Sequence, residues 1–495
     1  MRRAGILLPV ASLPSDYGIG CFSKEAYNFV DALESAGQRC WQILPLGPTS
    51  YGDSPYSSFS TFAGNPYFID PDALVEKGWL KKDSLLSYDF GKNVHYIDYG
   101  KIYKARFPML REAFKNSGIE ASKAFQDFVE ENSGWLKDYA LFMAIKDENG
   151  GRAYLSWDKD LRLRKKEALT SFEKEHGQDI LFYEFLQFEF AEEWEKLRAY
   201  ANEKGIKIIG DIPIYVAMDS ADSWANPSLF QFDEDQNPIA VAGCPPDAFS
   251  KTGQLWGNPL YNWEYHRETA YEWWIERLKR VFSLYDIVRI DHFRGFDAYY
   301  SIPYGEKTAV NGKWEKGPGY DLFKRVKEVL GEREVIAEDL GYITKSVKRL
   351  TKRTGFPGMK VLQFAFDSRE ESDYLPHNYE KNSVVYTGTH ENDTLLGWYK
   401  SIIKRDRDYA DSYLNIKGLD EKEIPWAFIR AAYGSVSELC IVPMQDYLSL
   451  GTEARTNLPS TLGENWKWRM GKKDFTKKLM TRIKKLVDIY RRSGE

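Results

Sequence analysis

Short apolar runs recur along the chain, and each predicts a β-strand. They cover residues 5–10, 40–46, 207–214, 286–290, 334–338, 360–366, 383–389 and 439–444. Runs rich in Val and Ile, without polar alternation, are typical of strands that are buried on both faces. Such strands occur in parallel sheets that helices cover.

Segments with helical periodicity lie between many of these runs. The first begins after Ser23, a residue suited to the N-cap, and ends at Gly37; its apolar positions at i, i+3, i+4 and i+7 are Ala26, Phe29, Val30 and Leu33. Similar patterns cover residues 271–284, 321–330 and 346–353. Strands that alternate with helices predict βαβ units, and eight such strands predict an α/β protein with a closed (β/α)8, or TIM, barrel.

Uneven spacing of the predicted strands indicates large, mainly helical insertions. Residues 47–206 are too many for a loop, and helical patterns occur among them at residues 103–114, 121–131, 136–146 and 181–200. We therefore expect one barrel domain over residues 1–495, with an inserted helical subdomain over residues 70–180 after the second strand.

Two further segments complete the predicted architecture. Residues 215–265, after the third strand, are a long aromatic segment, which we expect to be a loop that shapes a cleft or forms a lid. After the eighth strand the sequence predicts a broken loop and a basic amphipathic helix over residues 474–492. No C-terminal β-domain is expected.

The composition narrows the classes of partner. The chain has a net charge of −5 and no basic block, which argues against nucleic acid. No apolar run approaches the roughly 20 residues that span a bilayer, so no membrane contact is expected. The aromatic share of 15% suits stacking on sugar rings, but it also suits protein cores and interfaces.

The cysteines and the N-terminus predict a cytoplasmic protein. The cysteines lack CxxC spacing and are expected to be free thiols in a reducing compartment: Cys21, Cys40, Cys244 and Cys440. Arg2 and Arg3 precede an apolar run in the manner of a signal peptide. However, Pro9 interrupts that run, which is shorter than the roughly 7–15 residues expected. We expect a first strand there instead.

The fourth predicted strand ends in a dense group of ionisable residues. Asp291 follows the apolar run, and Arg289 lies two residues earlier, so both side chains point to the same side of a strand. A neighbouring cation would keep the carboxylate ionised and oriented. This stretch alone is equally consistent with a structural Arg–Asp pair.

Acids also follow three other predicted strands. Asp211 lies at the end of the third and Glu338 at the end of the fifth, while His390 and Asp393 follow the seventh. Each acid alone has a simpler explanation as a helix N-cap. Four acids on the carboxyl ends of barrel strands, where barrel enzymes have their active sites, favour a catalytic site.

The acids have the roles that retaining cleavage of a glycosidic bond requires. That chemistry uses a nucleophilic carboxylate and a protonated acid about 5 Å apart. Asp291 beside Arg289 suits the nucleophile, and Glu338, after an apolar run and near other acids, suits the proton donor with a raised pKa. Asp393 would bind ring hydroxyls and stabilise positive charge at the reacting carbon.

Several segments resemble those of the 4-α-glucanotransferases, the amylomaltase or disproportionating-enzyme family, which is related to the α-amylases. The three acidic segments are residues 289–294 (RIDHFR), 336–341 (IAEDLG) and 387–393 (TGTHEND). The others are residues 54–56 (SPY), 64–67 (GNPY), 210–216 (GDIPIYV), 245–250 (PPDAFS), 253–259 (GQLWGNP), 465–466 (NW) and 468–469 (WR). The resemblance covers nearly the whole chain, and residues 245–259 resemble the family's lid loop.

The resemblance implies roles for individual residues. Asp291 would be the nucleophile, Glu338 the acid/base and Asp393 the transition-state stabiliser. The implied substrate-binding residues are Ser54, Tyr56, Asp211, Tyr215, Asp247, Phe249, Gln254, Trp256, Arg289, His390 and Asn465. Of these, Arg289, Asp211, His390 and Tyr56 would hold the donor sugar, and Phe249, Gln254 and Trp256 would line the acceptor side. Ser460 departs from the pattern, because the family has glycine there.

The implied activity is transfer of α-1,4-glucan segments from a donor to the 4-hydroxyl of glucose or another glucan, through a covalent β-glycosyl-aspartate. Maltooligosaccharides, starch or glycogen would be the partners, and neither a cofactor nor a metal is expected. An α-1,4-glucan hydrolase with the same acids would also fit these residues.

Three more classes of protein fit parts of the sequence. A metal-dependent barrel hydrolase would use His292 and His390, but neither an HxH at the end of the first strand nor an HExxH occurs. A nucleotide binder would use Gly18 and Gly20, but these lie far beyond the first strand, with Ser23 at the third position. The last class is a glucan-binding protein without activity.

Overall fold

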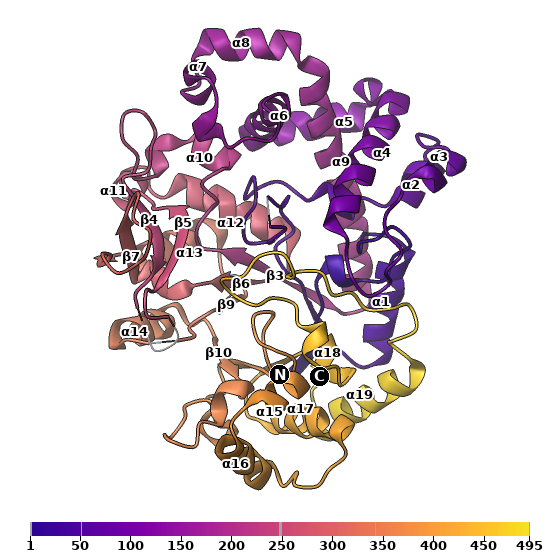
Figure 1. Ribbon diagram of the computed structural model, residues 1–495, viewed down its shortest axis with the longest axis vertical. Helices are drawn as coiled ribbons and strands as arrows, with labels where there is room; N and C mark the ends of the chain where they lie inside the picture. The colour runs from indigo at the N-terminus through magenta and orange to yellow at the C-terminus, as the bar shows by residue number, and fades with distance from the viewer. Residues whose placement is uncertain (1, 51, 247–249, 342, 495) are drawn as a thin grey trace.

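The strands predicted from the sequence form a closed parallel barrel. The computed structural model describes residues 2–50, 52–246, 250–341 and 343–494. Among these residues the barrel order is β1-β12-β11-β10-β9-β6-β3-β2, so the eight strands follow one another in chain order around the ring (Figure 1). They are β1 Arg3–Leu7, β2 Cys40–Gln42, β3 Lys207–Pro213, β6 Ile287–Asp291, β9 Val335–Ala337, β10 Gly358–Val361, β11 Ser383–Tyr386 and β12 Leu439–Pro443. This confirms the predicted (β/α)8 barrel.

The barrel strands differ from their predicted bounds, and β1 and β10 show why. β1 ends at Leu7, before Pro9, and the chain then forms the 3-10 helix Val10–Ser12. Proline lacks the N–H that continues a sheet ladder. β10 ends at Val361, and the buried residues that follow form the 3-10 helix Leu362–Ala365. In both cases the apolar run continues past the end of the strand, because burial alone does not distinguish a strand from a helical turn.

Successive side chains of β6 point alternately into the barrel and outward toward the helices. Ile287 packs in the interior of the barrel with Ile209 of β3 and Ile336 of β9. The intervening Val288 and Ile290 pack outward, toward the helices. Because the side-chain period of a strand is two, Arg289 and Asp291 follow Ile287 on the inner face. The strand therefore delivers two charged groups to the carboxyl end of the barrel.

A helical insertion connects β2 to β3, as the spacing predicts, and lies in the upper part of Figure 1. Its last helix, α9 Gly177–Glu203, leads into β3 and contacts α1 Lys24–Ser35 and α6 Ser133–Glu148. The other helices are α2 Pro71–Glu76, α3 Lys82–Ser87, α4 Tyr99–Ser117, α5 Lys123–Glu131, α7 Lys159–Arg162 and α8 Lys166–Glu175. The subdomain bounds of 70–180 remain a proposal.

A second sheet was not predicted. Four antiparallel strands of the described chain form it in the order β5-β4-β7-β8, at the left of Figure 1. They are β4 Ala240–Cys244, β5 Gln254–Pro259, β7 Ala298–Pro303 and β8 Lys313–Lys316. Thus the segment 215–265 is not simply a loop. β4 combines Ala, Gly and Cys with a single Val, and β5 contains Gly257 and Asn258, so neither has the Val/Ile run that indicates a strand.

The remaining α-helices lie around the barrel, and those after residue 390 are in the lower part of Figure 1. They are α10 Ala221–Ala225, α11 Trp263–Glu268, α12 Glu272–Leu284, α13 Tyr320–Leu330, α14 Lys345–Thr354, α15 Leu395–Ser401, α16 Lys404–Leu414, α17 Ile424–Gly434, α18 Met444–Tyr447 and α19 Lys477–Tyr490. The chain ends meet, since Arg3 forms an antiparallel bridge with Ser493. None of the helices in the described ranges is long and apolar enough to cross a membrane.

Gly64 lies where the segment after β2 packs against α9 of the helical insertion. Its N–H donates to Gln187 Oε1 at 2.6 Å and its carbonyl accepts from Gln187 Nε2 at 2.9 Å, both from α9. A Cβ at Gly64 would lie 2.2 Å from the ring of Phe190. We expect Gly64→Ala to lower the melting temperature, because overpacking costs about 1–3 kcal/mol. Gly134→Ala is the control, since nothing lies within 4 Å of its added Cβ. Equal melting temperatures for the two variants would contradict this account.

Candidate active site

A buried guanidinium joins two carboxylates at the carboxyl end of the barrel. Arg289 Nη1 donates to Asp211 Oδ2 at 2.6 Å, and Nη2 donates to Asp291 Oδ1 at 2.8 Å. The register of β3 and β6 pairs Asp211 with Arg289, so the pairing of the two strands itself brings these side chains together. The Asp211 side chain is 0% exposed and that of Asp291 is 30% exposed. Asp211 is therefore buried, and Asp291 is the carboxylate that a ligand can contact.

The charges of this triad depend on one another. Burial disfavours a charge on Arg289, but Asp211 and Asp291 raise its pKa well above the ordinary value. Burial raises the pKa of Asp211 to about 6, against the lowering effect of Arg289. The hydrogen bond from Arg289 Nη2 to Asp291 Oδ1 gives this carboxylate the neighbouring cation that the sequence predicts.

Tyr56 and His390 extend this group. The Tyr56 hydroxyl donates to Asp211 Oδ2 at 2.7 Å, and its ring stacks on His390 with centroids 5.0 Å apart. Burial, and then the charge of Arg289, lower the pKa of His390 well below the ordinary value. The imidazole is therefore neutral at pH 7, and it offers a hydrogen-bonding edge without adding charge.

Glu338 follows β9 and lies beside the start of the turn after β6. Its Oε2 accepts from the backbone N–H of His292 at 2.8 Å, and its Oε1 accepts from that of Leu340 at 2.9 Å. Burial and then the negative charge of Asp291 raise its pKa to about 8, and these effects outweigh Arg289 and the Leu340 N–H. Glu338 is therefore protonated at neutral pH while its neighbour is paired with Arg289.

A cleft of about 1570 Å³ opens over these acids. The predicted residues that line it are Ser54, Tyr56, Tyr215, Gln254, Trp256, Arg289, Asp291, Glu338 and Asn465. Asp211 and His390 lie behind this surface, in contact with Arg289 and Tyr56. Asp247 and Phe249, also predicted to bind substrate, lie outside the described residues. Further acids at the rim, including Asp367, Glu370 and Asp373, give the cleft an excess of negative charge.

Aromatic rings form one wall of the cleft. The Trp256 ring meets the His292 ring edge to face, with centroids 4.8 Å apart, and lies 6.3 Å from the Tyr215 ring. Gln254 Oε1 accepts from the Trp256 indole N–H at 3.0 Å and fixes the ring. Burial lowers the pKa of His292 to about 4, so this wall is uncharged at neutral pH. Flat apolar faces with polar edges suit sugar rings.

The segment after β11 carries two acids, Glu391 and Asp393, with different surroundings. Asp393 Oδ1 accepts from Thr394 N–H at 2.8 Å, and Oδ2 accepts from the Thr452 hydroxyl at 2.8 Å. Glu391, which the sequence patterns did not single out, lines the cleft, whereas Asp393 is not among the described lining residues. Burial and then the charge of Asp291 raise the pKa of Glu391 to about 7. The only sequence signal for Glu391 is its position next to His390.

Asn465 organises a loop that borders the cleft. Its Oδ1 accepts from Leu458 N–H at 2.9 Å, and its Nδ2 donates to the Thr461 carbonyl at 2.8 Å. Ser460, within this loop, has φ of +63°. That left-handed conformation favours glycine, so the serine occupies a glycine-type backbone position. The side chain of Asn465 thus stabilises a turn in which Ser460 stands where the resemblance implies a glycine.

The two histidines of the site contact aromatic rings. His292 meets the ring of Trp256, and His390 stacks on that of Tyr56. Among the described ranges, no group of three or more His, Cys, Asp or Glu side chains is placed to hold a metal ion.

Known proteins match the chain over nearly its full length. The model of the protein family described as "4-alpha-glucanotransferase" matches residues 8–474. The 4-alpha-glucanotransferase of Clostridium butyricum is 52% identical over 485 residues, which cover 98% of this chain and 99% of that protein. That of Thermus thermophilus is 48% identical and covers 95% of each chain.

Solved structures agree with the sequence matches. The amylomaltase from Streptococcus agalactiae in complex with acarbose superposes with a TM-score of 0.97 at 43% identity, over 99% of this chain and 100% of that one. The amylomaltase from Corynebacterium glutamicum, at 19% identity and a TM-score of 0.77, shares the fold; the match covers 100% of this chain and 75% of that one.

The proton on Glu338 is directly measurable. We expect an infrared difference spectrum of wild type minus Glu338→Gln to show a protonated carboxyl band at pH 7, which disappears as the pH rises through about 8. Asp291→Asn removes a charge that raises this pKa, so in that background the band should disappear at lower pH. Absence of the band at pH 7 would show that Glu338 is ionised.

Proposed function

The chain belongs to the 4-alpha-glucanotransferase family, and from this premise we propose that its cleft moves α-1,4-glucan segments by double displacement. The observation that carries the proposal is that Arg289 holds Asp291 beside the partly buried Glu338. Asp291 is held by Arg289, and Glu338, whose pKa is about 8, contacts the N–H of the next residue, His292. An ionised nucleophile beside a protonated acid is the arrangement that a retaining mechanism needs.

In the first step Glu338 gives its proton to the glycosidic oxygen, and the bond from that oxygen to the anomeric carbon breaks. An oxygen of Asp291 bonds to the carbon, so the donor segment becomes a β-glycosyl ester and the leaving glucan departs with a 4-hydroxyl. Arg289 keeps its bond to Asp211 throughout. The nucleophile therefore stays oriented while its charge is consumed.

The second step reverses these roles. Once Asp291 is esterified, its negative charge no longer raises the pKa of Glu338, so the carboxylate of Glu338 is stable enough to act as a base. It takes the proton from the 4-hydroxyl of an incoming glucan, whose oxygen attacks the anomeric carbon. The ester bond breaks, Asp291 returns as a carboxylate, and an α-1,4 linkage forms.

Glu391 is the third carboxylate that we propose for this site. It lines the same cleft as Asp291, and we assign to it the stabilisation of positive charge at the anomeric carbon. The stabilising role predicted for Asp393 remains untested. Its two hydrogen bonds, to Thr394 and Thr452, favour a role in holding the loop.

The remaining residues are proposed to bind the sugar rings. Arg289, Asp211, His390 and Tyr56 form the base of the donor side. Gln254 and Trp256 line the acceptor side, with Asn465 at the edge of the cleft. Asp247 and Phe249 keep their predicted roles, and so do Ser54 and Tyr215. The acidic, aromatic lining favours a neutral polyol, so the proposed partners are α-1,4-glucans and glucose.

The proposed location is the cytoplasm. Cys21, Cys40 and Cys440 are buried free thiols. Free thiols are typical of a reducing compartment.

Incubation with maltotriose tests the proposal against hydrolysis. We expect a ladder of longer maltodextrins together with glucose from the wild type. Asp291→Asn should lose turnover by several orders of magnitude, since a covalent nucleophile is removed, with an unchanged circular dichroism spectrum. Formation of glucose and maltose alone would indicate a hydrolase. Near-normal turnover of the variant would remove Asp291 from its role.

Paired substitutions distinguish the two acids after β11. We expect Glu391→Gln to lower kcat by about 100-fold or more, as removal of electrostatic transition-state stabilisation does, with little change in melting temperature. Asp393→Asn should lower the melting temperature, because it disturbs the bond to the Thr452 hydroxyl, and should affect kcat less. The opposite ranking of the two kcat values would assign the stabilising role to Asp393.

A further inference from the structure

A second pocket adjoins the cleft behind the aromatic wall. Its volume is about 350 Å³, at the small end of the range for ligand sites. Ser57, Trp256 and Asn258 line both this pocket and the main cleft. The two spaces therefore border each other at these three residues.

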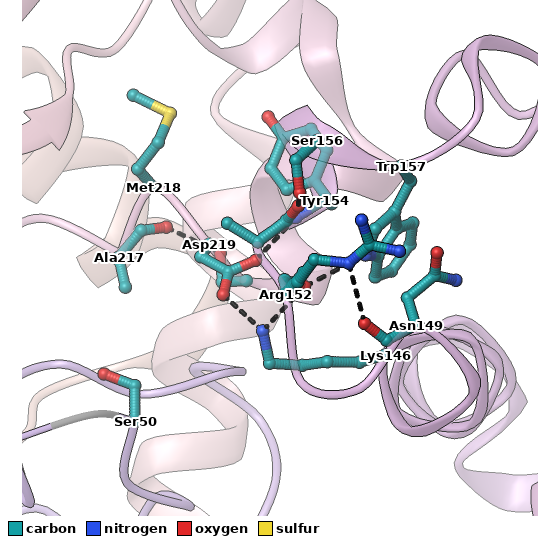
Figure 2. A network of polar contacts seen from close by, with 12 residues as sticks. Ser50, Lys146, Asn149, Arg152, Tyr154, Ser156, Trp157, Ala217, Met218 and Asp219 are labelled. Atoms are coloured by element: carbon teal, nitrogen blue, oxygen red, sulfur yellow. Dashed lines mark hydrogen bonds and ion pairs between the residues drawn. The ribbon is translucent and has the colours of Figure 1, made fainter.

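A buried ion pair forms the polar side of this pocket. Lys146 Nζ, from α6, lies 2.5 Å from Asp219 Oδ2, and their side chains are 7% and 27% exposed. Lys146 also donates to the Arg152 carbonyl at 3.2 Å, and Asp219 Oδ1 accepts from Tyr154 N–H at 3.0 Å. Figure 2 shows the ammonium between the carboxylate and the carbonyl, with Ser50 on a separate loop.

This pair retains hydrogen-bonding capacity. A carboxylate has about four acceptor positions, and an ammonium has three donors. Among the described residues, Asp219 uses two of these positions and Lys146 uses two of its donors. The more exposed Asp219 can therefore accept from hydroxyls. Since the pair is electrically neutral, it favours a neutral ligand over an anion.

Apolar groups line the pocket next to the ion pair. Phe59 lies under the ammonium, with its ring centroid 4.9 Å from Lys146 Nζ. Met218 and the ring of Trp256 also line the space. Apolar surfaces beside a polar pair match a pyranose ring, which has apolar faces and hydroxyl edges.

From these observations we propose that the Lys146–Asp219 pocket binds a distal glucose ring of the glucan on the acceptor side, and so gives the enzyme a preference for long acceptors. The inference rests on the proposed function, which places Trp256 on the acceptor side. A short sugar would occupy the cleft without reaching the pocket. A longer chain would add contacts with Asp219 and Phe59.

Ser50→Phe tests the pocket by filling it. Ser50 lines the pocket but not the cleft, and it is bonded to neither Lys146 nor Asp219. Binding is measured by calorimetry in the Asp291→Asn background, where glucans are not turned over. We expect Ser50→Phe to weaken maltoheptaose binding about tenfold, which corresponds to about 1.4 kcal/mol, and to leave maltose binding within twofold. Ser156→Phe is the control, because Ser156 lies in the same region (Figure 2) but outside the pocket.

A second variant removes the ammonium group of the ion pair and does not fill the pocket. Lys146→Met should reduce maltoheptaose binding in the same selective way, with retained folding checked by its melting curve. If both variants bind maltoheptaose as the control does, or if maltose binding falls equally, the pocket inference is wrong. The maltotriose assay on the wild type tests the proposed function separately, because the binding measurement requires no turnover.

Discussion

The arrangement of the site depends on one buried cation. Arg289 lies in the barrel interior, where an unpaired charge would be costly, so its guanidinium must be matched by anions. Asp211 and Asp291 supply them at 2.6 and 2.8 Å. Asp211 lies on β3 and Arg289 and Asp291 lie on the adjacent β6, so the pairing of these two strands sets the distances between the three groups. A carboxylate that would otherwise be mobile is thereby fixed at the floor of a cleft.

Burial and then the charge of Asp291 keep the proton on Glu338 by raising its pKa. Because Arg289 holds Asp291 close to Glu338, a second negative charge at this buried place is disfavoured. Backbone N–H groups of His292 and Leu340 orient Glu338 without fully offsetting this effect. The different roles of nucleophile and acid thus follow from which carboxylate Arg289 contacts.

The sequence was sufficient for parts of the structure governed by simple periodicity. The barrel strands and the inward direction of Arg289 and Asp291 follow from apolar runs and from the two-residue repeat. It was insufficient where the chain leaves a strand: Glu391 and Asp393 are two residues apart, and the sequence does not tell that Glu391 lines the cleft while Asp393 bonds to Thr394 and Thr452. The antiparallel sheet was missed because β4, β5 and β8 lack the Val/Ile run that indicates a strand.

The central claim is that Asp291 bonds to the sugar while Glu338 handles the proton. Mass spectrometry of Glu338→Gln after treatment with α-maltosyl fluoride tests it most directly, because fluoride leaves without protonation and the second step lacks its base. The account predicts a maltosyl group on the peptide that contains Asp291. A maltosyl group on a different residue, or full consumption of the fluoride without any adduct in a rapidly quenched sample, would contradict it.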